Sequence, residues 1–219
     1  TVVSVESWTK SVSAIQEVSG TDAVKNLNQS AQVSYIRLSR FGDHTNEEWE
    51  KAVAEVAAAA KSGSRGLIFD LRNNPGGYLD GAVYIASEFI RSGIVVSQVN
   101  SNGSKEDYPV VRSGALLTIP VVVLVNKGSA SAAEIVAGAL RDYKRGTLVG
   151  EVTFGKGSVQ TPEDLPDGSG LHITTGKWLL PKGDSIHKTG VTPEVLVAME
   201  EFEATRDAQL AKAIELLLK

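Results

Sequence analysis

Residues 120–143 read PVVVLVNKGSASAAEIVAGALRDY, and this stretch sets the expected fold. The continuous apolar run at 120–125 is typical of a fully buried strand, and the alanine-rich run at 131–143 is typical of a helix. Three turn-forming residues, NKG, separate the two. The order of strand, turn and helix predicts that Ser131 lies at the first turn of the helix, where unpaired backbone N–H groups favour negative charge.

Strands and helices are predicted to alternate through the first two-thirds of the chain. Short apolar runs between turn-forming residues indicate the strands, and longer apolar-faced segments indicate the helices. Thr45 followed by Glu48 is the capping-box pattern that starts the first of these helices. The predicted strands are 33–38, 67–71, 94–99 and 121–125, and the predicted helices are 45–61, 79–90 and 131–143.

The C-terminal third has a different character. Residues 158–165 and 171–179 are predicted to form a β-hairpin around Asp167 and Gly168, and residues 206–218 an amphipathic helix. The two parts together predict an α/β fold with a mixed sheet core, flanking helices, a β-rich C-terminal third and a C-terminal helix.

A serine and a lysine in two short glycine-containing segments suggest a hydrolase. Ser131 lies in GSASAAEI and Lys156 lies in FGKGSVQ. A serine hydroxyl is a weak nucleophile until a neighbouring base removes its proton, and a lysine can be that base when an apolar pocket disfavours its charged form. Phe154 and Val159 would wall such a pocket. The neutral amide of Gln160 would orient the amine without adding a charge.

Backbone amides near the serine would stabilise the oxyanion that forms during attack. The amide of Ala132, in the first helical turn, is one candidate donor. The second donor would come from RNNPGGYLD, where Pro75, Gly76 and Gly77 form a tight loop after the strand at 67–71.

Each of these features also has a purely structural interpretation. Taken alone, Ser131 would more often cap or pack a helix, and Ser129 in the same GSAS segment could be the cap. Lys156 alone would more often be exposed to solvent. Its even spacing from Gln160 permits a contact in an alternating strand but does not require one. The NPGG loop could be a simple turn.

Five sequence blocks together resemble the C-terminal processing proteases, also called tail-specific proteases. Their number and order are far more specific than one short pattern. The resemblance implies a ClpP/crotonase-like fold and a serine endopeptidase that cleaves proteins near their C-termini. The blocks, between residues 33 and 197, are YIRLSRF, FDLRNNPGG, LVNKGSASAAEIVAGAL, VGEVTFGKGSVQT and GLHITTGKWLLPKGDSIHKTGVTPEV.

The resemblance also implies a role for each candidate residue. Ser131 is the nucleophile, Lys156 the general base and Gln160 the orienting residue, while the loop and helix amides named above supply the oxyanion donors. The implied substrates are proteins or peptides with accessible C-termini, a homo-oligomer or regulatory partner is an open prospect, and no metal or organic cofactor is implied.

Family members usually carry a PDZ domain before the YIRLSRF-like strand, and no such domain is recognised here. Residues 1–32 are predicted to be an N-terminal arm or post-PDZ segment, and residues 33–219 the protease core. The resemblance places the enzyme in the periplasm, the cell envelope or the thylakoid lumen. No targeting segment or membrane span is recognised in the sequence.

The composition is typical of one soluble catalytic domain. Of 219 residues, 42% are hydrophobic and 22% charged, as in ordinary globular proteins. A net charge of −4 without a basic stripe gives no electrostatic support for nucleic-acid binding. The absence of cysteine excludes disulfides and thiolate metal sites, and the three histidines lack close ligand spacing.

Two other classes of function stay open at the level of sequence. GEVTFGKGS nearly matches the phosphate-binding pattern G-x-x-x-x-G-K-[ST], but Gly157 replaces the hydroxyl residue and the next residues read as a strand instead of a helix. Glycine-rich loops before helices also serve acyl-CoA chemistry. A Ser–His–acid enzyme with His187 as its base is a minor third interpretation.

Overall fold

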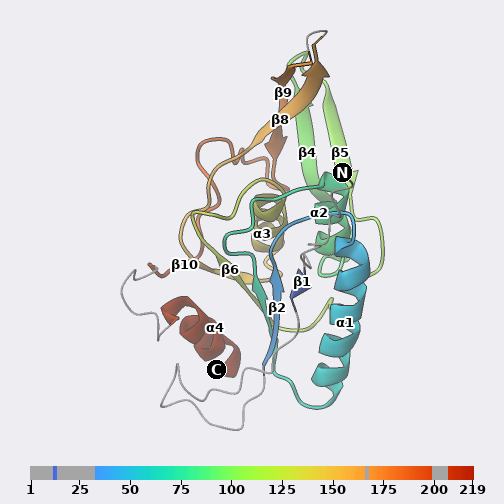
Figure 1. Ribbon diagram of the computed structural model, residues 1–219. Coiled ribbons are helices and arrows are strands. Elements are labelled where there is room, and N and C mark those ends of the chain that lie inside the picture. Colours follow the sequence, from blue (N-terminus) through green and yellow to red (C-terminus); the bar gives the residue numbers. More distant parts are fainter. Residues whose placement is uncertain (1–11, 14–32, 166–167, 199–206) are drawn as a thin grey trace, which may run out of the picture.

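The chain folds around a mostly parallel sheet (Figure 1). The computed structural model describes residues 12–13, 33–165, 168–198 and 207–219. Within these residues the strand order is β1-β2-β3-β6-β7-β10, and only the β1–β2 pair is antiparallel. The strands are β1 (Val12–Ser13), β2 (Ser34–Leu38), β3 (Leu67–Asp70), β6 (Val121–Val125), β7 (Thr147–Gly150) and β10 (Val195–Leu196).

Helices cover both faces of this sheet. One face is covered by α1 (Thr45–Lys61), α2 (Leu79–Ala86) and α3 (Ala132–Asp142), and the other by α4 (Ala208–Leu218). Adjacent residues of β3 show the division, because Phe69 packs in the cluster under α1 to α3 and Ile68 packs under α4. Burial of both faces explains why the strand sequences are continuous apolar runs.

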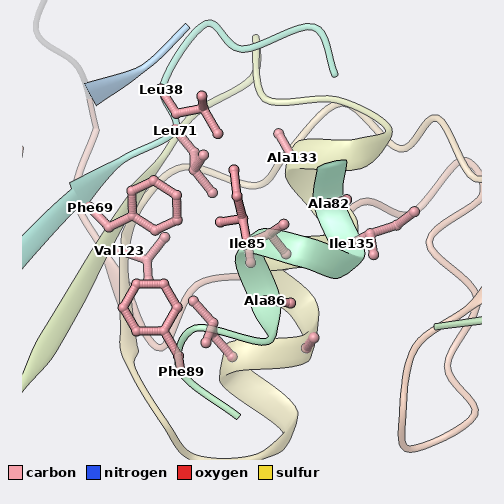
Figure 2. Close-up of a cluster of buried hydrophobic side chains, with 14 of the residues drawn as sticks. Leu38, Phe69, Leu71, Ala82, Ile85, Ala86, Phe89, Val123, Ala133 and Ile135 are labelled. Atoms are coloured by element: carbon pink, nitrogen blue, oxygen red, sulfur yellow. The ribbon is translucent and has the colours of Figure 1, made fainter. Parts of the chain in front are cut away.

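The larger of the two hydrophobic clusters holds α3 in place. Figure 2 shows Ala133 and Ile135 of α3 in this cluster together with Ile85, Phe89 and Phe69. Ten of the 11 residues of α3 are buried, which its many alanines permit because they need little space. The start of α3 is therefore fixed relative to the ends of β3 and β6, and this end of the sheet carries the candidate site.

A second, antiparallel sheet projects from the core (Figure 1). It has the order β5-β4-β9-β8. Trp178 anchors it to the core and meets Tyr108 of β5 edge to face at 6.0 Å. The strands are β4 (Ile94–Asn100), β5 (Lys105–Pro109), β8 (Ser158–Asp164) and β9 (Gly170–Leu179).

The predicted α/β fold and most of its elements are confirmed. The strand at 121–125 has the predicted limits, but α2 ends at Ala86, four residues earlier than predicted. The capping box at Thr45 is wrong. His44 is the N-cap, and the Thr45 hydroxyl accepts a hydrogen bond from the Gly42 amide at 2.8 Å instead.

Several elements were not predicted or lie beyond the described residues. β5 was missed because its sequence, KEDYP, is mostly exposed and lacks an alternating apolar pattern. β7 and β10 are too short to give a clear signal. Of the predicted arm at 1–32, only Val12–Ser13 are described, and Asp167 and Arg206 lie outside the described residues.

A buried ionic network fastens α4 to the segment that follows β3. Arg72 forms ion pairs of 2.7 Å with Asp70 and with Asp207, whose carboxylate also caps α4 by accepting the Leu210 amide at 2.9 Å. The Tyr35 hydroxyl donates to Asp70 at 2.7 Å. Burial and the adjacent Asp70 carboxylate raise the pKa of Tyr35, which keeps the phenol protonated as a donor. In the described part of the chain, no helix has the length and apolarity needed to cross a membrane.

Candidate active site

Ser131 lies where the sequence predicts, at the N-terminus of α3 after the turn that follows β6. Its backbone has φ 54° and ψ −117°, in a region that favours glycine. A side chain in this conformation costs on the order of 1–3 kcal/mol, and such costs persist where the surrounding structure imposes them. Ser131 is half-buried and is the N-cap residue of α3, at a sharp turn between a strand and a helix.

The two serines of GSAS have different environments. Ser129 is fully buried, and its hydroxyl donates to the Leu71 carbonyl at 2.8 Å and accepts the Asn126 amide at 3.0 Å. Ser129 therefore joins the ends of β3 and β6. Of the two, only Ser131 has a side chain that a substrate can reach.

Glu134 connects the serine loop to the lysine loop, and sequence reasoning missed it. Its carboxylate is fully buried. One oxygen accepts the amides of Ser131 at 2.8 Å and Lys156 at 2.9 Å. The other accepts the Thr153 hydroxyl at 2.5 Å and the Gly155 amide at 2.7 Å. The carboxylate thus receives four donors and faces no cation among its described partners.

These hydrogen bonds bring the backbones of the two catalytic candidates together. Because the amides of Ser131 and Lys156 donate to the same oxygen, they lie within about 6 Å of each other. A further bond, from the Phe154 amide to the Ser129 carbonyl at 3.0 Å, continues the contact between the loops. Residues 25 positions apart in sequence therefore meet at one site.

The predicted apolar enclosure of Lys156 differs from the observed one. Phe154 is 68% exposed and Lys156 is also exposed, while Val159 packs partly against the core. Burial alternates along 153–157, because Thr153, Gly155 and Gly157 are buried while Phe154 and Lys156 between them are exposed. The Thr153 hydroxyl and the Gly155 amide face Glu134.

Gln160 lies on β8, but the spacing argument for its contact with Lys156 does not apply. Strand β8 begins at Ser158, so Lys156 lies outside the strand whose alternation would put positions 156 and 160 on one face. The β8–β9 pairing shifts register beside Gln160, with Thr175 of β9 as the extra residue. Gln160 is exposed.

The NPGG loop lies directly against the serine. A Cβ atom on Gly76 would be 2.8 Å from the Ser131 Cβ and 3.0 Å from the Ala132 amide nitrogen. The Gly76 amide already donates to the Asn74 side chain at 2.8 Å, whereas the exposed Gly77 amide donates no hydrogen bond within the described part of the chain. Of the two glycine amides, only that of Gly77 is without an acceptor among the described residues.

Asn74 holds this loop in place and is a second residue that the sequence analysis missed. It is fully buried, and its side chain donates to the Leu38 carbonyl at 2.8 Å. The backbone carbonyl of Asn74 accepts a hydrogen bond from the Ala130 amide at 2.9 Å. These bonds tie the loop to β2 on one side and to the serine loop on the other.

Replacing Gly76 with alanine is expected to reduce kcat/KM by about tenfold or more, because the new methyl group would displace the serine loop or the NPGG loop from each other. Gly63 is a matched control, since it also has a positive φ but nothing would lie within 4 Å of a methyl group at that position. Peptide hydrolysis by both variants measures the difference. Equal losses in the two variants would mean that backbone strain, not contact with Ser131, is responsible.

This geometry does not support phosphate binding or metal binding at the site. In the phosphate-binding interpretation, the amides of Gly155 and Lys156 would hold phosphate, but here they donate to Glu134. The strand β8 follows where a helix would be needed. Among the described residues, no group of three histidine, aspartate or glutamate side chains could hold a metal ion.

Comparison with known proteins gives consistent matches. The model of peptidase family S41 matches residues 32–197. A carboxyl-terminal-processing protease of Synechocystis sp. is 40% identical over 190 residues, which are 84% of this chain and 44% of the relative. The chloroplastic C-terminal processing peptidase of Tetradesmus obliquus is 42% identical over 164 residues, which are 75% of this chain and 35% of the relative.

Solved structures agree with the sequence matches. A photosystem II D1 C-terminal processing protease superposes with a TM-score of 0.74 at 34% identity, over 95% of this chain and 52% of that one. The chain spans less than half the length of the two curated relatives named above.

Proposed function

Because this chain belongs to peptidase family S41, we propose that it is the core of a serine endopeptidase that cleaves proteins near their C-termini. The observation that carries the proposal is the pair of hydrogen bonds from the amides of Ser131 and Lys156 to one oxygen of Glu134. A nucleophile and a base must lie within reach of each other, and this shared acceptor brings their backbones together.

In the proposed reaction, Ser131 attacks the scissile carbonyl and its proton passes to neutral Lys156. The amides of Ala132 and of the NPGG loop stabilise the oxyanion, with Gly77 favoured because its amide has no other acceptor among the described residues. Lys156 then protonates the leaving amine. Water, activated by Lys156, hydrolyses the acyl-enzyme and restores the serine.

The exposure of Lys156 places a requirement on the substrate. A lysine acts as a base only in its neutral form, which water disfavours. A peptide lying across Ser131 would contact the exposed Phe154 and cover the amine, so binding of substrate would supply the desolvation. Gln160, which is exposed on β8, would orient the amine in that complex.

Location and partners belong to the same proposal. One relative is named as chloroplastic, and a solved structure is named for processing photosystem II D1. By analogy, we place this chain outside the cytoplasm, with protein tails as substrates and a homo-oligomer or regulatory partner as an added level of control.

The proposal is tested by a mass-spectrometric time course with an unstructured protein that has an apolar, free C-terminus. The wild-type chain is expected to release fragments whose masses locate the cut close to that terminus, and Ser131→Ala is expected to release none. Cleavage by Ser131→Ala at the wild-type rate would exclude the assigned nucleophile. Binding of nucleotide or CoA in the absence of any cleavage would favour the other classes of function.

A further inference from the structure

A groove of about 410 Å³ lies beside the lysine loop, on the second sheet. Its walls come from the ends of β4 and β8, from β9, and from the segment that contains His187. We call it the β9 groove. Its polar lining residues are Asn100, Ser101, Ser158, Thr174, Thr175, Lys177 and His187.

The register of the sheet places Lys177 in the middle of this groove. Lys177 pairs with Val99 on one side and with Ser158 on the other, and all three line the groove. The next residue, Trp178, is buried in the core, so Lys177 lies on the opposite, outer face. Its side chain is exposed.

His187 closes the end of the groove that is nearest to the catalytic candidates. Its backbone packs directly against Gly157, the residue after Lys156. The Lys188 amide also donates to the Gly155 carbonyl at 2.8 Å. The groove therefore begins at Ser158, two residues beyond the proposed base, and extends along β9, a position where one end of an extended substrate would lie.

The charge of the β9 groove is one-sided. Its lining contains Lys177 and His187 but no aspartate or glutamate, although the chain as a whole carries a net charge of −4. Neither residue forms an ion pair with any residue that the structure describes. Hydroxyl and amide donors surround the two side chains. A cationic lining with extra donors and no competing acid favours a carboxylate ligand.

We infer that the β9 groove binds a carboxylate of the peptide substrate, with Lys177 as its cationic contact and an N–H group of His187 as a second hydrogen-bond donor. The inference rests on the proposed peptidase function and deepens it, because it names a chemical feature of the substrate close to the scissile bond. The carboxylate can come from a free C-terminus or from an aspartate or glutamate side chain. Both present the same pair of acceptor oxygens.

The test measures peptide binding by fluorescence polarisation in the Ser131→Ala background, where no cleavage occurs. Two labelled peptides share one sequence without acidic residues, one with a free C-terminus and one with a C-terminal amide. The third is amidated and differs from the second only by an internal Gln→Glu change. A lower Kd for the first peptide alone assigns the C-terminal carboxylate, and a lower Kd for the third assigns the side chain. Equal Kd values for all three would overturn the inference.

Single-residue variants then test whether the β9 groove is responsible for the preference for a carboxylate. Lys177→Met is expected to raise the Kd of the preferred peptide about fivefold and to leave that of the uncharged peptide unchanged, as for a partly solvated charge pair. His187→Gln should have a smaller effect in the same direction. Lys182→Met is the matched control, since Lys182 is exposed and does not line the groove. The same loss in Lys182→Met would mean that overall charge, not the groove, determines binding.

The same peptides separate this inference from the proposed function. Cleavage of all three by the wild-type chain, with no preference in binding, would support a peptidase and overturn the carboxylate site. Preferential binding that Lys177→Met abolishes, without cleavage of any peptide, would support the site and contradict the peptidase.

Discussion

Lys156→Ala is expected to lower kcat by at least about a hundredfold while the protein remains folded. Removing a general base typically costs a factor of about 10² to 10⁴, because no other group takes the serine proton during attack. The side chain of Lys156 is exposed, so its loss should change the free energy of unfolding by no more than about 0.5 kcal/mol. Peptide hydrolysis and urea unfolding, measured on the same preparation, check both parts.

Lys127→Ala is the control for this experiment. Lys127 lies in the turn before Ser131, its side chain is 83% exposed, and its ion pair with Glu151 is at the surface. We expect its kcat to stay within about twofold of the wild-type value, since surface ion pairs contribute little. A folded Lys156→Ala variant with full activity would rule out the Ser–Lys pair.

Glu134→Gln is expected to reduce both activity and stability. Whichever way the amide is oriented, its NH₂ group would face at least one backbone N–H that now donates to a carboxylate oxygen. Unpaired buried donors cost about 1–3 kcal/mol each, so the free energy of unfolding should fall by about 2–4 kcal/mol. Because the serine and lysine loops would separate, kcat should fall by about a hundredfold, with a smaller change in KM.

A second buried glutamate allows the two effects to be distinguished. Glu88 is 1% exposed and accepts the Leu116 amide at 3.1 Å, together with an ion pair to Arg112, but it contacts no candidate site residue among the described ones. Glu88→Gln should lower stability and leave kcat nearly unchanged. An unaltered kcat in Glu134→Gln would show that other contacts hold the two loops together.

The parts of the fold that follow from local pattern were predictable. Strand β6, the turn and α3 form one continuous signal, and that signal located Ser131 correctly. α2 was predicted to be too long because the apolar pattern continues after Ala86, while the Ser87 hydroxyl bonds back to the Val83 carbonyl and the chain turns. Periodicity reports which residues are buried, not where the backbone hydrogen bonds stop.

The parts of the site that depend on contacts between distant segments were not predictable. Glu134 occupies an ordinary position for a glutamate in the first turn of a helix, and its partners in the lysine loop lie about 20 residues away. Phe154 was predicted to shield Lys156 because it is apolar and close in sequence, but both side chains are exposed to solvent. The bulge at Thr175 of β9, opposite Gln160, has no sequence signal of its own.

The positive φ of Ser131 has a consequence for how such a sequence evolves. At this torsion angle a glycine would be relaxed, and the serine is retained at a cost on the order of 1–3 kcal/mol. Selection for stability alone would therefore favour glycine at position 131. Only selection for the hydroxyl group favours serine there. In a lineage that no longer needs this hydroxyl, replacement of Ser131 by glycine is expected early, and the replacement should raise the thermal stability of the protein.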